Sequence, residues 1–217
     1  MDTGVNYNHQ LLRHFCNQAQ AESWNPDWPH YDEYAPLQPY NDHGSIQAGI
    51  VSFGDLQTAL LSHENISISY TIESGRILPP AGTNDPELYG AVTVGTAAKL
   101  EIERPDLNRV YSLAVTSAPE REGGQHSSWS AEIDQFSSGL EDGIQRLFVI
   151  SAGNNTEVHA LTDYWDQVHL AQIEDPAQSW NALTVGAYTE KTTNDDTNFV
   201  NWGWRTLPAM ESEREGW

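Results

Sequence analysis

Short apolar runs alternate with helix-length segments in the second half of the chain. The runs at residues 109–115, 147–150 and 182–187 are mostly apolar, which is typical of strands buried on both faces of a sheet. Between the first two runs, apolar residues recur at helical spacing: Trp129, Ile133, Phe136, Leu140 and Ile144. A strand, a helix and a second strand at this spacing predict a parallel βαβ unit. The pattern therefore indicates an α/β fold with a largely parallel sheet.

The segment before residue 109 carries weaker patterns that predict two helices and two strands. The first helix begins just after His43–Gly44, and its apolar face consists of Ile46, Ile50 and Phe53. The second covers about residues 86–100 and starts at Pro86, since proline is tolerated in a first turn. The strands are predicted at residues 66–70, which alternate, and at residues 76–78.

Residues 17–42 interrupt these patterns with four prolines set among tryptophans and tyrosines. Prolines at this density favour a loop, and the aromatic side chains would fix it to the surface. We therefore expect an ordered loop insertion within one domain that covers residues 1–217.

Charge narrows the choice of partners. The 217 residues hold 10 Lys and Arg against 31 Asp and Glu, so the net charge is −21. This balance excludes a basic nucleic-acid footprint and disfavours anionic membrane surfaces. No run of 18 apolar residues and no signal peptide is visible, and Cys16 is the only cysteine, so we expect a cytoplasmic protein with no disulfide.

Three short motifs could together carry chemistry: Asp2-Thr3-Gly4, then His43-Gly44-Ser45 followed by Ala48-Gly49, and Ser151-Ala152-Gly153-Asn154 directly after a predicted strand. Each alone is a common turn or strand exit. A nucleophilic hydrolase needs a carboxylate that orients an imidazole, a histidine that moves the proton and a donor for the oxyanion. Asp2, His43 and Asn154 are the matching residue types.

In this order the motifs resemble those of subtilisin-like serine peptidases (subtilases, the S8 family). The resemblance covers most of residues 2–190 and leaves residues 191–217 as a tail outside the clear match. It implies a three-layer sandwich with a mostly parallel sheet flanked by helices. It also implies a serine endopeptidase with an Asp-His-Ser triad and an asparagine oxyanion donor. Its catalytic residues would be Asp2, His43 and Asn154.

The same resemblance implies two segments that bind substrate. Leu113-Ala114-Val115-Thr116 would pair with the peptide backbone, and Ser151-Ala152-Gly153 would form a wall of the specificity pocket. A peptide bound in this way adds a strand to an exposed edge. The partner would be a peptide or protein substrate.

Two features depart from the family pattern. No Gly-Thr-Ser motif follows Asn154, and only Met1 precedes Asp2, whereas the family's aspartate ends a buried strand. We therefore expect a partial domain, truncated before the catalytic serine, that is inactive alone. The alternative is a non-catalytic peptide-binding pseudoenzyme, or a fragment that needs a complementing segment.

Other enzyme classes are less well supported. An aspartic peptidase needs two carboxylates that share a proton, and Asp-Thr-Gly occurs once. A zinc peptidase motif, His-Glu-x-x-His, is absent. We expect no cofactor and name no metal ligand, although the resemblance allows structural calcium. It also suggests a bacterial protein, in some branches associated with an AAA-type ATPase.

Overall fold

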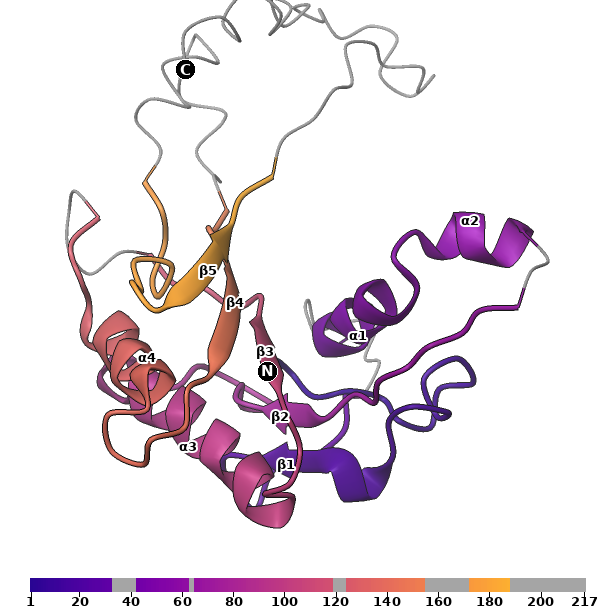
Figure 1. The fold of residues 1–217 in the computed structure, drawn as a ribbon, viewed down its shortest axis with the longest axis horizontal. Helices are drawn as coiled ribbons and strands as arrows, with labels where there is room; N and C mark the ends of the chain where they lie inside the picture. The colour runs from indigo at the N-terminus through magenta and orange to yellow at the C-terminus, as the bar shows by residue number, and fades with distance from the viewer. Residues whose placement is uncertain (33–41, 63–64, 119–123, 155–171, 188–217) are drawn as a thin grey trace, which may run out of the picture. The chain divides into compact units, whose positions relative to one another are not determined.

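Strands and helices are interspersed along the chain, as in α/β proteins (Figure 1). The computed structural model describes residues 1–32, 42–62, 65–118, 124–154 and 172–187. Within these ranges the elements are η1 (Gln18–Gln20), β1 (Ala21–Ser23), α1 (His43–Phe53), α2 (Leu56–Leu61), β2 (Ser74–Arg76), η2 (Pro86–Leu88), α3 (Tyr89–Glu103), β3 (Val110–Leu113), α4 (Ser128–Ser138), β4 (Leu147–Ser151) and β5 (Ala182–Val185). All of them belong to one compact unit, which comprises residues 1–154 and 172–185.

Two parallel sheets form the centre of this unit. Strands β3, β4 and β5 pair in that order, with Tyr111 opposite Phe148 and Ile150 opposite Thr184. Strands β1 and β2 form a second parallel pair. The predicted βαβ unit is therefore confirmed as β3, α4 and β4, and the α/β class with it.

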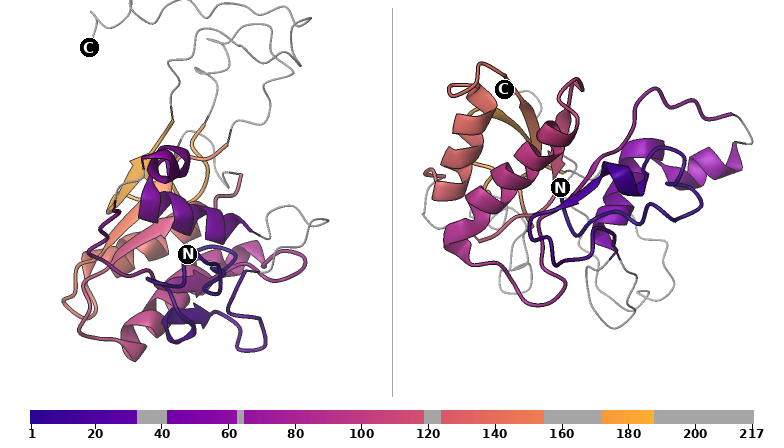
Figure 2. Two further views of the ribbon diagram at one scale, coloured as in Figure 1. Left: turned by 90° about the vertical axis from the view of Figure 1, so that its right-hand side faces the viewer. Right: turned by 90° about the horizontal axis from the view of Figure 1, so that it is seen from below.

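The main core lies between the β3–β5 sheet and the helices α3 and α4, which lie side by side in Figures 1 and 2. Alternate residues of β3 and β4 point into it, and the aromatic rings of Tyr111 and Phe148 stack with their centroids 4.7 Å apart. The helices contribute Val92, Ala97, Trp129 and Ile133. Burying side chains of this size stabilises the fold by about 1.5–3 kcal/mol each.

Helix α4 is shorter than its apolar period predicts. It begins at a capping box formed by Ser127 and Ser130, and its C-cap is Gly139, which adopts φ 69°. Glycine favours this left-handed conformation, and the helix stops there. Leu140 is consequently 81% exposed and Ile144 55% exposed, so neither continues the buried apolar face that the helical spacing of residues 129–144 predicts.

Helix α1 presents a different face to the protein than its sequence predicts. Ile46 and Ile50 are 51% and 53% exposed, and the buried residues are Gly44, Ala48 and Ser52. The reason is close backbone approach, because only small side chains fit where this helix packs on the N-terminal segment. The predicted apolar face is therefore wrong at Ile46 and Ile50, whereas Phe53 packs against the ring of Phe15 and the helix itself is confirmed.

Strand positions before residue 109 also differ from the prediction. Residues 66–70 form no strand, and Ile66 and Tyr70 are each 48% exposed. Instead β1 lies inside the segment expected to be a loop, where it pairs with β2 and buries Ala21. Residues 33–41 of that insertion and the whole predicted tail, residues 191–217, lie outside the described residues.

Met1 and Asp2 lie between the two sheets. The Asp2 N–H donates to the Gly75 carbonyl over 3.0 Å, and the Asp2 carbonyl accepts from the Ile77 N–H over 2.9 Å. On the opposite side the Met1 amino group donates to the Ser112 carbonyl over 2.8 Å. These contacts hold Asp2 at the carboxyl ends of the strands, where ligands bind in parallel sheets.

Candidate active site

Asp2 and His43 form a close carboxylate–imidazole pair. Both carboxylate oxygens of Asp2 lie 2.8 Å from Nδ1 of His43, and the Thr3 N–H donates to Oδ1 over 2.7 Å. Asp2 is 5% exposed, whereas about a third of the His43 side chain is open to solvent. Because Nδ1 faces the carboxylate, Nε2 is the nitrogen that can exchange a proton with a group in the cleft.

His43 is held in place by the first turn of α1. The Gly44 N–H donates to the Thr3 hydroxyl over 2.9 Å. A Cβ atom at position 44 would overlap the carbonyl oxygen of Gly4 and lie 3.1 Å from Oγ1 of Thr3. The glycine is therefore what allows the helix to approach the segment that carries Asp2.

Carboxylates dominate the electrostatics around His43. The hydrogen bond with Asp2 raises the pKa of His43 above its ordinary value, against the opposing effect of burial, and the nearby Asp32 and Asp42 add to the rise. Asp32 is only 2% exposed and accepts a hydrogen bond from the Ser45 N–H over 3.1 Å. Burial raises the pKa of Asp32 to about 6. The carboxylates around the ring thus stabilise the imidazolium relative to the neutral imidazole.

A cleft of about 540 Å³ brings together three of the predicted site segments. Its lining includes His43, residues 114–117 and Asn154, together with Trp129 and residues 77–84. Asn154 is exposed, in the segment that follows β4. A histidine, an amide donor and a chain segment that continues from β3 therefore meet in one cavity of a size that suits small ligands.

The other predicted substrate residues lie differently. Leu113 is 1% exposed in the main core, so its side chain cannot line the cleft. Ser151 ends β4 opposite Val185, and the Ala152 N–H donates to the Val185 carbonyl over 2.9 Å. Of the four-residue Ser-Ala-Gly-Asn motif, only Asn154 lies in the cleft lining.

Glu174 joins the two predicted substrate segments. Its N–H donates to the Ala152 carbonyl over 2.9 Å, and its carboxylate accepts a hydrogen bond from the Thr116 hydroxyl. Its side chain also fills the space where a Cβ on Gly153 would lie. Sequence reasoning missed Glu174, Asp32 and the hydroxyl role of Thr3, and no local pattern marks any of them.

A comparison with known protein families shows to which family the chain belongs. A sequence model of the subtilase family matches residues 1–210. The chain belongs to the subtilase family. The match runs past residue 190, where the clear motif resemblance ends, and it includes most of the predicted tail. A search of curated proteins and a search of solved structures found no match.

Membership explains why these residues meet. In this subtilase, as the motifs predict, the aspartate precedes the histidine; Asp2 lies beside the carboxyl end of β2, and His43 is the first residue of α1. Among the described residues, no group of three or more His, Cys, Asp or Glu side chains is placed to hold a metal ion. Within the same ranges no helix is long and apolar enough to cross a membrane.

Proposed function

We propose that this site is the Asp–His–Asn part of a serine endopeptidase centre. The contact between the Asp2 carboxylate and Nδ1 of His43 carries the proposal, because it fixes the tautomer in which Nε2 can accept the proton of a serine hydroxyl. Asp2 would then stabilise the imidazolium that forms. Asn154 would donate to the oxyanion, a contact whose loss costs about 10²–10³ in kcat in subtilisin itself.

We propose further that these 217 residues alone do not hydrolyse peptides. No Gly-Thr-Ser motif follows Asn154 in the sequence. Ser179 is buried and donates to the Ser130 carbonyl over 3.1 Å, so it is poorly placed to attack a substrate. Without a nucleophile, covalent catalysis is lost, while peptide binding and the oxyanion contact can remain.

The proposed substrate is an extended peptide with a basic side chain. Ala114, Val115 and Thr116 follow β3 and line the cleft, where the peptide backbone could add alongside them. Glu174 places a carboxylate between Thr116 and Gly153, next to this segment. A lysine or arginine side chain would pair with that carboxylate, whereas an acidic one would be repelled.

A fluorophosphonate probe tests the inactivity of the purified 217-residue protein. We expect no labelled serine, with subtilisin as the positive control. Binding is tested separately by NMR titration with a lysine-containing peptide, which should shift the resonances of His43, Val115 and Asn154. Specific labelling of any serine would overturn the proposal of inactivity, and a titration without shifts would overturn the proposed peptide site.

A non-catalytic peptide-binding role is the second candidate. It is favoured by the coexistence of a formed cleft with a sequence that lacks the serine motif. Both candidates predict peptide binding, so the flanking DNA separates them. In-frame codons for Gly-Thr-Ser beyond residue 217 would favour the peptidase, and a stop codon directly after residue 217 would favour the binding module.

A further inference from the structure

A second carboxylate, that of Asp32, lies close to the Asp2–His43 pair. It is 2% exposed, and its Oδ2 accepts a hydrogen bond from the Ser45 N–H in the first turn of α1 over 3.1 Å. Burial raises its pKa, and hydrogen bonds from the Ser45 N–H and from the hydroxyls of Ser45 and Thr3 oppose this effect. Burying a carboxylate is costly, and the chemistry assigned to Asp2 and His43 does not use this one.

The partners of Asp32 connect the two motifs of the site. The Thr3 hydroxyl accepts from the Gly44 N–H over 2.9 Å, and the Ser45 hydroxyl accepts from the Asn6 N–H over 2.8 Å. Each hydroxyl therefore still has its own proton to donate. An ionised carboxylate is an acceptor-only group that can take both protons together with the Ser45 N–H. Asp32 thus joins the Asp-Thr-Gly motif to the first turn of α1.

The backbone that carries Asp32 is fixed to the same strand as Asp2. The guanidinium of Arg76 in β2 donates to the Tyr31 carbonyl over 2.8 Å and to the Pro29 carbonyl over 3.3 Å. Asp2 forms a parallel bridge with the same arginine residue. Both carboxylates are therefore placed by the end of β2, at fixed positions relative to each other.

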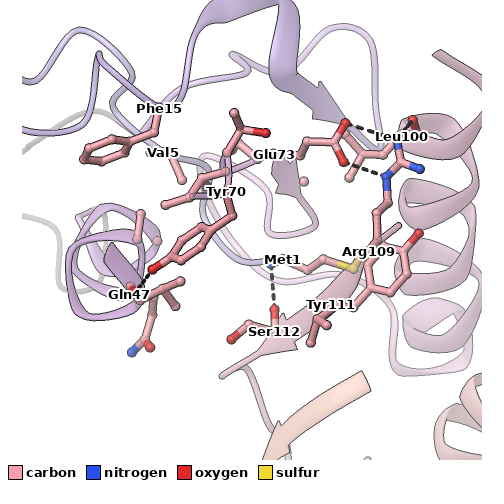
Figure 3. Close-up of a pocket in the computed structure, with 18 of the residues that line it drawn as sticks. Met1, Val5, Phe15, Gln47, Tyr70, Glu73, Leu100, Arg109, Tyr111 and Ser112 are labelled. Carbon is pink, nitrogen blue, oxygen red and sulfur yellow. Dashed lines mark hydrogen bonds and ion pairs between the residues drawn. The ribbon is translucent and has the colours of Figure 1, made fainter. Parts of the chain in front are cut away.

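Other contacts hold α1 beyond its first turn. Ala48 packs in a small apolar cluster with Val5. The Tyr70 hydroxyl donates to the Val51 carbonyl over 2.7 Å, at the edge of a cavity that both residues line (Figure 3). These contacts lie more than one turn beyond His43. The hydrogen bonds of residues 44 and 45, in contrast, act directly beside the imidazole.

We propose that Asp32 is a positioning residue of the proposed peptidase centre: its carboxylate holds the first turn of α1 against residues 2–4 and so keeps His43 aligned with Asp2. This inference rests on the proposed function, because the alignment matters for catalysis only if His43 carries the proton. Its test observes His43 and Ser45 in the free protein, so its outcome is independent of serine labelling and of peptide binding.

The charge of Asp32 makes a second contribution. Charged groups reach it from three elements: Asp2 in the N-terminal segment, His43 on α1, and Arg76 on β2, which binds the carbonyl of the preceding residue. The hydrogen bond with Asp2 raises the pKa of His43 most, and the negative charge of Asp32 adds to the rise. An ionised Asp32 therefore stabilises the imidazolium that forms when His43 accepts a proton.

The test compares two substitutions that each remove one negative charge near His43. Asp32→Asn keeps the shape of the side chain but turns one of its two acceptor oxygens into a donor. Asp42→Asn is the matched control, because Asp42 also raises the pKa of His43 but forms no side-chain cap hydrogen bond with α1. Both variants should lower the pKa of His43. In NMR at pH 8, only Asp32→Asn should let the Nδ1 proton exchange with water about 10-fold faster.

Two measurements separate positioning from stability. Because a buried charge is removed, Asp32→Asn should be at least as stable as the wild type at pH 8, which urea denaturation checks. Acidification needs no variant: the Ser45 amide proton of the wild type should shift upfield as the pH falls through about 6. The proposal is overturned by equal Nδ1 exchange in the wild type and Asp32→Asn, by equal increases in both variants, or by a wild-type Ser45 amide that does not titrate.

Discussion

Replacing Gly44 by alanine should uncouple His43 from Asp2. The new Cβ would overlap the carbonyl oxygen of Gly4, and it would also lie 3.0 Å from the carbonyl carbon of that residue. These are backbone atoms, so no side-chain rotation can relieve the clash. The first turn of α1 must move away from the segment that carries Asp2.

The size of the effect is set by the contacts that this movement breaks. Overpacking of this kind costs about 1–3 kcal/mol. The hydrogen bond from the Gly44 N–H to Thr3 contributes about 1 kcal/mol more. We therefore expect Gly44→Ala to lower the free energy of unfolding by about 2–4 kcal/mol, a substantial part of a typical 5–15 kcal/mol. As the contact of His43 with Asp2 lengthens, the pKa of His43 should fall towards its ordinary value.

Urea denaturation and NMR titration of the His43 ring measure the two effects separately. Gly49→Ala is the matched control, because Gly49 lies in the same helix and its added Cβ would meet no described atom within 4 Å. Removing a helical glycine there should stabilise the protein by about 0.5–1 kcal/mol. The reasoning is refuted if Gly44→Ala matches the wild type in both stability and His43 titration.

Three further substitutions test the charges of the site. Asp2→Asn should lower the pKa of His43, because the hydrogen bond that raises it is weakened. The wild type has extra stability below pH 6.5, which is lost as the pH rises through the raised pKa of folded His43. In pH-dependent denaturation the variant should not show this loss. Asp32→Asn should remove a loss of stability that occurs as the pH rises from about 4 to 6. The Asp32 carboxyl binds its proton more tightly in the folded protein, and a rise in its pKa from 3.8 to about 6 corresponds to at most about 3 kcal/mol. At pH 8 the variant should be more stable than the wild type by up to this amount in urea denaturation. Glu174→Gln should weaken binding of a lysine peptide about 5-fold and leave a norleucine peptide unchanged, as measured by calorimetry. The expectations would be contradicted by an unaltered His43 titration in Asp2→Asn or by an unaltered pH profile of stability in Asp32→Asn. For Glu174→Gln, the contradicting result is an equal loss of affinity for both peptides.

The sequence predicts best where an apolar run is continuous. Strand β4 pairs with a neighbouring strand on each edge, and its apolar run at residues 147–150 is unbroken, although only Phe148 and Ile150 are fully buried. The apolar period of α4 is equally clear, but it continues past Gly139, where the backbone turns to positive φ. Periodicity alone therefore predicts the helix and misplaces its end, although the glycine is a signal for the end.

Elements that depend on distant partners are not readable locally. Strand β1 has the sequence Ala-Glu-Ser, which carries little strand preference, and it forms because β2 offers it a parallel partner and buries Ala21. Nothing in the local sequence distinguishes Asp32 from other acidic residues in loops. It is buried because the backbone around it packs against Gly4. Both belong to the framework of the site, and tertiary contacts alone place them.

The Asp-Thr-Gly and His-Gly motifs are informative together because they are the two halves of one contact. In Asp2-Thr3-Gly4 the first residue binds the imidazole of His43, the second accepts the N–H of Gly44, and the third supplies the backbone against which Gly44 packs. Each residue has a partner in the other motif, about 40 positions away along the chain. Either motif alone is compatible with many turns. Together they supply a carboxylate, a hydroxyl and a glycine from residues 2–4, and an imidazole and a glycine from residues 43–44. The complementarity of the pair, rather than the composition of either part, is what predicts an oriented histidine from the sequence.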